Sequence, residues 1–104
     1  MMKMLIVMDY DKIRREEKLD ISKIERFFEH EFTKRGIYKD SDGFYVGGDF
    51  ASFGGMVWGL SETQWFMENV KTWIWYNSDG HSNPNEYSAE DLIKHYRGKN
   101  LWEG

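Results

Sequence analysis

The chain opens with a continuous apolar run, Met4–Met8, that ends at two aspartates, Asp9 and Asp11. Apolar neighbours without alternation are typical of a strand buried on both faces, although so short a run also fits a buried helical turn. The pattern predicts a first strand over Lys3–Asp9. Residues 12–19 are almost all charged, which favours a solvated loop or an irregular entry to a helix.

Helical periodicity starts after Asp20, a residue type that caps helix N-termini well. The apolar residues that follow recur three and four positions apart, as expected for one buried helix face. They are Ile21, Ile24, Phe27, Phe28 and Phe32. Gly36 supplies a C-terminal stop, so the pattern predicts a helix between Asp20 and Gly36.

Two short β-prone segments come next, Ile37–Lys39 and Phe44–Val46. The residues between them, 40–43, end in an Asp-Gly pair, so the two segments are predicted to form a hairpin.

The segment Phe50–Leu60 gives a mixed signal. Its apolar residues Phe50, Phe53, Val57 and Leu60 match helical spacing, but each glycine in a helix interior costs about 1 kcal/mol. The glycines are Gly54, Gly55 and Gly59. We expect a helix in which these glycines let a strand or a partner chain approach the backbone closely.

The clearest strand is Val70–Tyr76, where side chains alternate between two faces. One face carries Val70, Thr72, Ile74 and Tyr76, and the other carries Lys71, Trp73 and Trp75. Because a tryptophan-rich sheet face needs a cover, a second subunit is predicted to bury it.

The remaining pattern is a polar loop, Ser78–Asn85, and a short helix that Ser88 and Asp91 open and Gly98 ends. The whole order is strand, helix, hairpin, helix, strand, with this loop and helix appended. It predicts a single α+β domain, 1–104, on the ferredoxin-like βαββαβ plan, with an antiparallel sheet and two helices on one face. The predicted core covers about 3–77 and the appended part covers 78–104.

Composition narrows the setting. A chain of 104 residues suits one domain, and the absence of cysteine excludes disulfides and thiolate zinc sites and favours the cytoplasm. The longest apolar run is too short for a membrane span or a signal peptide, so neither is expected. The net charge of −4 argues against coating nucleic acid by bulk electrostatics, but it leaves room for a local basic patch.

Several short motifs together resemble the virulence-associated protein D (VapD) family. They are the leading Leu-Ile-Val-Met-Asp9, the segment Gly36–Val46, a loosely matching helix that ends near Leu60, and Trp65-Phe66 followed by Val70-Lys71. The resemblance spans roughly residues 3–76. It implies a homodimeric ferredoxin-like protein related in fold to small CRISPR-associated nucleases, with endoribonuclease activity and toxin–antitoxin association in some members.

The resemblance carries over residue by residue. Asp9 matches the Asp at the end of the family's first strand, Gly43 and Tyr45 match its Gly-X-Tyr, and Lys71 matches the basic position after Val. The sequence departs from the pattern at Phe44, Asn69 and Thr72-Trp73 and in the glycine-rich segment, so substrate choice and activity itself stay open.

Asp9 is the first catalytic candidate. A strand-end carboxylate can ligate Mg²⁺ or another divalent metal, or act as a base on a 2′-hydroxyl. In a two-fold dimer, Asp9 of each chain would face its mate and share one metal or one proton. Asp11 is a supporting candidate that points the same way only if the strand continues. The alternative is a solvated acid at a strand end.

Six residues are candidates for binding RNA. Arg14 and Arg15, with Lys18, form the densest basic cluster, although pairing with Glu16 and Glu17 is the alternative. Tyr45, Lys71 and Trp73 combine a cation with aromatic rings, a common way of holding single-stranded bases. Burial of the tryptophans in a dimer is the alternative. His30 is expected to be inert, and His81 is a weaker acid–base candidate.

These observations leave two main functions open. The first is a VapD-like endoribonuclease that cleaves single-stranded RNA as a homodimer, as the toxin of a toxin–antitoxin pair with an antitoxin partner. The second is a non-catalytic, acidic protein-binding module of the inhibitor or immunity type. A dimeric regulatory domain that binds a small ligand against its tryptophans is a third and weaker reading.

Overall fold

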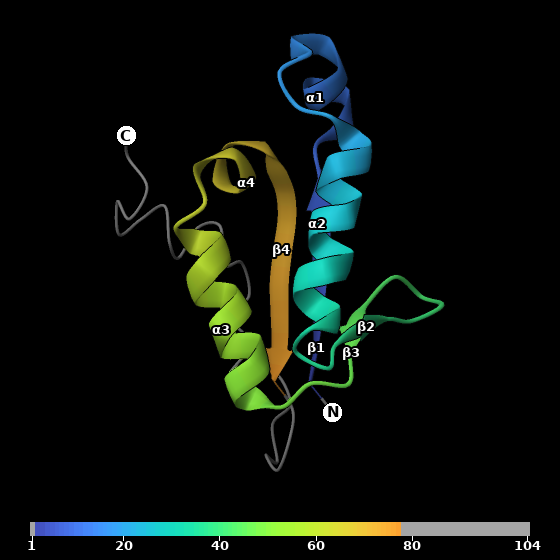
Figure 1. The fold of residues 1–104 in the computed structure, drawn as a ribbon, viewed down its shortest axis with the longest axis vertical. Helices are drawn as coiled ribbons and strands as arrows, with labels where there is room; N and C mark the ends of the chain where they lie inside the picture. The colour runs from blue at the N-terminus through green and yellow to red at the C-terminus, as the bar shows by residue number, and fades with distance from the viewer. Residues whose placement is uncertain (1, 78–104) are drawn as a thin grey trace.

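A four-stranded antiparallel sheet with the strand order β2-β3-β1-β4 organises the molecule, and its fold class is α+β. The computed structural model describes residues 2–77 (Figure 1). In chain order the elements are β1 (Met2–Met8), α1 (Tyr10–Glu16), α2 (Ile21–Thr33), β2 (Tyr38–Lys39), β3 (Tyr45–Val46), α3 (Phe50–Ser61), α4 (Gln64–Asn69) and β4 (Val70–Asn77). The predicted first strand, hairpin and last strand are confirmed.

β1 is the central strand, and its two neighbours differ in length. β4 pairs with it along its whole course, from Met2 opposite Asn77 to Met8 opposite Val70. β3 pairs with it only at Lys3 and Met4. The turn between β2 and β3 projects away from the sheet (Figure 1).

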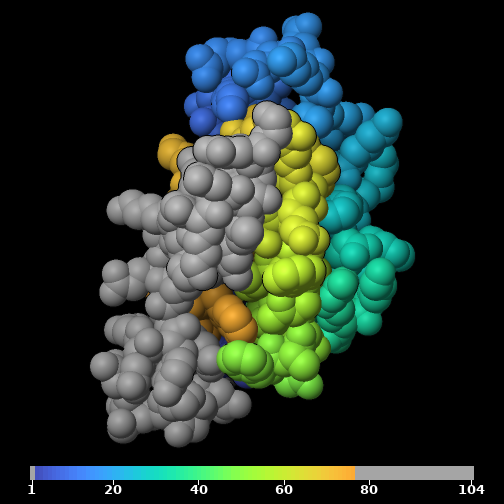
Figure 2. Space-filling model, turned by 90° about the vertical axis from the view of Figure 1, so that its left-hand side faces the viewer, coloured from blue at the N-terminus to red at the C-terminus, as the bar shows by residue number. Residues whose placement is uncertain are grey.

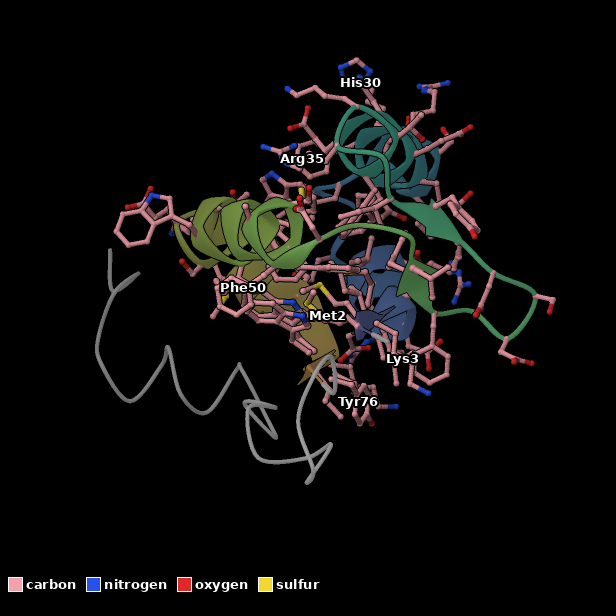
Figure 3. The ribbon with its side chains drawn as sticks, turned by 90° about the horizontal axis from the view of Figure 1, so that it is seen from below. Met2, Lys3, His30, Arg35, Phe50 and Tyr76 are labelled. Atoms are coloured by element: carbon pink, nitrogen blue, oxygen red, sulfur yellow. The ribbon has the colours of Figure 1, made fainter. Side chains whose placement is uncertain are left out.

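The helices α2 and α3 lie on the same side of the sheet, while Lys3 and Tyr76 lie on the opposite side (Figure 3). The layer between these helices and the sheet is the apolar core. Its largest fully buried side chains are Trp73, Phe32, Phe53 and Phe66.

Both predicted helices are confirmed, and each begins at an aspartate. Asp20 Oδ1 accepts hydrogen bonds from the Ser22 N–H (2.9 Å) and hydroxyl (2.8 Å), and the apolar stripe of α2 faces the core. The Asp49 carboxylate accepts from the Ser52 N–H at 2.8 Å and caps α3. Gly36 adopts φ 77° after α2, a conformation that glycine reaches without steric cost.

The prediction of a solvated loop or an irregular entry to a helix over 12–19 is wrong for residues 12–16 and fits only residues 17–19. This charged stretch is helical up to Glu16. It forms α1 because the Asp9 carboxylate caps the first turn and because Ile13, 2% exposed, anchors the helix to the core. One buried residue in a charged run is too weak a pattern to be read as helical. The short helix α4 was not predicted from the sequence. Its residues Phe66 and Met67 are both completely buried.

The tryptophan face of β4 is covered by the chain's own helices, which corrects the prediction that a second subunit covers it. Trp73 is 0% exposed, and its ring meets that of Phe66 in α4 edge to face, with 5.0 Å between centroids. Trp75 packs against Phe50 and Phe53 of α3. These rings belong to the monomer's core.

A bulge near the start of β4 breaks the predicted alternation. Neighbouring residues of β1 lie opposite Thr72 and Val70, so Lys71 has no residue opposite it on β1. Val70 is buried while Lys71 is exposed. The prediction that Lys71 and Trp73 share one regular strand face is therefore wrong.

The glycines of α3 make no close approach to another described residue. A Cβ added at Gly54 or Gly59 meets nothing within 4 Å, and one at Gly55 meets only Arg35 Nε at 3.7 Å. Within residues 2–77, the expectation that these glycines admit a neighbouring strand is therefore wrong.

The predicted loop Ser78–Asn85, the helix opened by Ser88, and His81 lie outside the described residues. Over residues 2–77, no helix combines the length and the apolar character needed to cross a membrane.

Candidate functional site

Asp9 lies at the junction of β1 and α1 and is half-buried, and three hydrogen bonds hold it, one of them from the Ile13 N–H to its carbonyl at 3.0 Å. Its backbone N–H donates to the Asn69 carbonyl at 2.7 Å, and its Oδ1 accepts from the Lys12 N–H at 3.1 Å. Oδ2 has no hydrogen-bond partner among the described residues. Asp9 is thus the N-cap of α1, with one carboxylate oxygen left for another partner.

Asp11 does not continue the strand, because the chain turns into α1 directly after Asp9. Its carboxylate pairs with Arg14 Nη1 at 3.1 Å, and both side chains are largely in solvent, at 93% and 63% exposure. Arg15 Nε donates to the Asp11 carbonyl at 3.4 Å. Asp11 is expected to point the same way as Asp9 only if the strand continues past Asp9. The strand ends there, so Asp11 does not support Asp9 in this way.

The basic residues of α1 divide into two groups. Lys12 Nζ donates to the Glu68 carbonyl at 2.6 Å and so ties α1 to the C-terminal end of α4. Arg14, Arg15 and Lys18 are exposed. The predicted pairing of these cations with Glu16 and Glu17 is not observed, because the salt bridge runs to Asp11 instead. Figure 2 shows α1 at one end of the molecule, above α2 and α4.

The three residues predicted to hold RNA bases do not form one surface. The ring of Trp73 is completely buried, so neither of its faces is open to a base. Tyr45 is 7% exposed, and its ring stacks on Phe32 with 3.9 Å between centroids. Lys71 alone is exposed. The prediction of base stacking on Trp73 is wrong in this conformation, because its ring is part of the core.

The described residues of one protomer form no group of three His, Asp or Glu side chains that could hold a metal ion. Within residues 2–77, Asp9 is therefore a single potential ligand, and the described side chains do not by themselves supply the donor set of a divalent metal. His30 is exposed on α2, with Nε2 3.9 Å from Glu31 Oε2.

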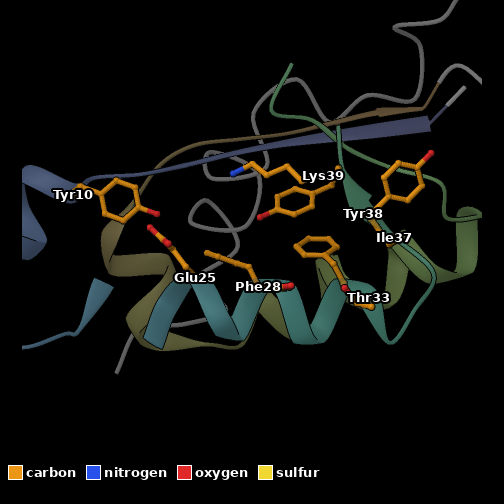
Figure 4. Close-up of a pocket in the computed structure, with 10 residues that line it drawn as sticks. Tyr10, Glu25, Phe28, Thr33, Ile37, Tyr38 and Lys39 are labelled. Atoms are coloured by element: carbon orange, nitrogen blue, oxygen red, sulfur yellow. The ribbon is translucent and has the colours of Figure 1, made fainter. Parts of the chain in front are cut away.

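A groove of about 600 Å³ lies between α2 and the hairpin, and we call it the α2–β2 groove (Figure 4). Its floor is apolar, its rim is charged, and it reaches Tyr10 at the start of α1. The residues that line it are Tyr10, Glu25, Phe28, Glu29, Phe32, Thr33, Ile37, Tyr38, Lys39 and Tyr45. Figure 4 shows the Glu25 carboxylate directed towards Tyr10, with the Lys39 side chain extending into the same space.

The electrostatics of this groove are shaped by burial. Burial, with smaller contributions from the nearby Tyr10 and Glu25, raises the pKa of Tyr45 to about 12. Burial and the Glu25 carboxylate also raise the pKa of Tyr10, against a smaller lowering by Arg14. Both phenols are therefore neutral hydrogen-bonding groups at neutral pH.

Sequence reasoning missed the α2–β2 groove. The available signal was Glu25 and Glu29, four residues apart on α2 and flanking the core residue Phe28. That pattern looks like ordinary solvated helix surface, and only the position of the hairpin makes it one wall of a groove.

The chain matches no protein-family model, no curated protein and no solved structure.

Proposed function

We propose that the protein is a VapD-like endoribonuclease that cleaves single-stranded RNA as a homodimer. The observation that carries this proposal is Asp9, a half-buried carboxylate at the end of the central strand. One of its oxygens has no partner among the described residues, and it precedes a helix with two exposed arginines. A positioned carboxylate at the start of α1 and two arginines in its last turn are residue types suited to chemistry on a phosphodiester.

We further propose that the fold is the ferredoxin-like plan. Read from β4, the strand order is β4-β1-β3-β2 with antiparallel pairing throughout, and a helix-containing connection links β1 to β2 and β3 to β4. The placement of α2 and α3 on one face supports the same plan (Figure 3).

In the proposed reaction, Asp9 takes the proton of a 2′-hydroxyl, whose oxygen attacks the adjacent phosphorus, and the 5′-oxygen leaves with a proton from water. Arg14 and Arg15 hold the phosphate through charge-assisted hydrogen bonds. A divalent metal such as Mg²⁺ would need a second ligand set, which the Asp9 of a second protomer is proposed to supply. The base route needs no metal.

The test compares two aspartates that each cap the N-terminus of a helix. Asp9→Asn and Asp49→Asn each change a helix N-cap, and Asn caps nearly as well as Asp, so both variants are expected to stay folded. Labelled single-stranded RNA is incubated with each protein, with magnesium and with a chelator. We expect Asp9→Asn to lose about a hundredfold or more in cleavage rate, as for a lost general base, and Asp49→Asn to match the wild type.

Equal activity of the two variants would show that Asp9 is only a helix cap and would remove the proposed mechanism. If the wild type cleaves RNA with magnesium but not with the chelator, the mechanism in which two Asp9 carboxylates share a metal is favoured.

The acidic protein-binding module is the second candidate, and one observation favours it. The N-cap role explains why an aspartate stands at position 9 without any chemistry. If folded wild-type protein leaves the RNA intact, the result favours the protein-binding module over the endoribonuclease.

A further inference from the structure

The central strand has an open edge. On the side of β3 its pairing ends at Met4, while on the other side β4 continues to Met8. Among the described residues, Leu5–Met8 therefore have hydrogen-bonding neighbours on one side only. A strand directs its backbone groups alternately to its two sides, so this stretch offers unpaired N–H and C=O groups to an added strand.

The α2–β2 groove spans the same stretch. Tyr45, which lines the groove, lies opposite Met4, where the pairing with β3 ends. Tyr10, which lines its other end, follows β1 beyond Met8. A strand added to the open edge would therefore direct every second side chain towards the groove.

The charge of the groove indicates which side chains of an added strand would bind in it. Glu25 and Glu29 place two carboxylates on its rim, against the single ammonium of Lys39. The groove already accommodates that cation, because Lys39 Nζ lies 5.6 Å from the centroid of the Tyr45 ring. Carboxylates near aromatic rings favour guanidinium and ammonium groups and disfavour phosphates.

The other face of the open edge is apolar. Leu5 and Val7 alternate with the core residues of β1, and Val7 is 39% exposed. Side chains of an added strand that point away from the groove would lie beside these two, so apolar residues fit there.

We propose that Leu5–Met8 and the α2–β2 groove together bind an extended segment of a partner protein, in which basic and apolar residues alternate. The segment pairs as a strand with β1, its basic side chains enter the groove, and its apolar side chains cover Leu5 and Val7. Strand addition to an exposed edge, with side-chain pockets for specificity, is a common mode of peptide recognition. This inference does not depend on RNA cleavage.

The probe is a five-residue peptide with blocked ends that alternates valine and arginine. It is titrated into the full-length ¹⁵N-labelled protein and followed by NMR. We expect the amide resonances of Leu5–Met8 to shift, and hydrogen exchange to slow at the alternate amides that point away from β4, because these amides gain partners. A peptide that alternates valine and glutamate is expected not to bind, and N-methylation of the arginine peptide's backbone is expected to weaken it at least fivefold.

The matched variants change the same charge at two places. Glu25→Gln with Glu29→Gln removes both rim carboxylates and is expected to weaken the arginine peptide about fivefold, the effect of two exposed ion pairs. Glu16→Gln with Glu62→Gln changes two exposed glutamates outside the groove and is expected to leave binding unchanged.

Shifts that avoid Leu5–Met8, or equal weakening in the two double variants, would overturn the proposal. Displacement of the arginine peptide by single-stranded RNA, with shifts at Leu5–Met8, would also overturn it and would assign the groove to nucleic acid.

Discussion

Tyr45 shows how far a single residue can depart from what its type suggests. As the aromatic residue that matches the Gly-X-Tyr of the VapD family, it is a sequence-based candidate for holding RNA bases. In the folded chain its ring stacks on Phe32, and 7% of the residue remains exposed. The burial of Tyr45 affects the stability of the protein, because a buried phenol resists ionisation.

The pH dependence of stability should reveal this burial. The pKa of Tyr45 is about 12 in the folded protein and near 10 when unfolded, so below pH 10 both states carry the proton and no stability is lost. As pH rises from 10 to 12, the unfolded state ionises first, and folding loses up to about 3 kcal/mol. Urea unfolding across this window is expected to show a steeper fall for wild type than for Tyr45→Phe. Identical slopes would contradict the burial.

The aspartates that begin the helices show what separates structure from chemistry at the scale of elements. Asp9, Asp20 and Asp49 each accept a hydrogen bond from an N–H in the first turn of a helix. Only Asp20 is recognisable from the sequence, because a clear apolar stripe follows it. Asp9 precedes a charged run, and its capping role emerged only when that run was seen to be helical.

The glycines around α3 give a prediction at the same scale. Gly54→Ala and Gly59→Ala are each expected to raise the free energy of unfolding by about 0.5–1 kcal/mol, because an added Cβ meets no described residue and helical backbone entropy is reduced. Gly48→Ala is expected to lower it, because its Cβ would lie 2.5 Å from Cγ1 of the buried Ile37. Urea denaturation measures all three variants. A loss of stability in Gly59→Ala would indicate that another chain approaches α3.

At the scale of the whole molecule, the two sides of the sheet are unequal. The helices cover one side, where the tryptophans lie. The other side carries Lys3, Leu5 and Val7 of β1 and Tyr76 of β4, with Lys3 Nζ 4.2 Å from the centroid of the Phe44 ring. The surface available for a dimer has therefore moved from the predicted face to the opposite one.

Light scattering tests the proposed homodimer and its face together. We expect the wild type to scatter as twice the monomer mass and Tyr76→Arg, on the sheet face opposite the helices, to scatter as a monomer, because a buried unpaired cation in an apolar interface is strongly unfavourable. Trp58→Arg is the matched control, since Trp58 is 65% exposed on α3, and it is expected to stay dimeric. A monomeric wild type would rule out the homodimer at the concentration measured.

The sequence by itself determined the elements that have a strong local period or a strong end signal. The apolar run of β1, the stripe and cap of α2, the Asp-Gly turn of the hairpin and the alternation in β4 each express one local rule. They were enough to predict an α+β fold with a buried first strand and to single out Asp9 at the end of that strand.

Only the tertiary structure decided what lies beside what. Trp73 became core because α4 returns over β4, and Lys71 left its face because β4 bulges opposite β1. Glu25 faces Tyr10 because α2 lies alongside β1, whose end leads into α1 (Figure 1). Each of these outcomes depends on residues far apart in the chain. Local periodicity describes which face a side chain takes on its own element, whereas burial and grooves are set by whichever element packs against that face.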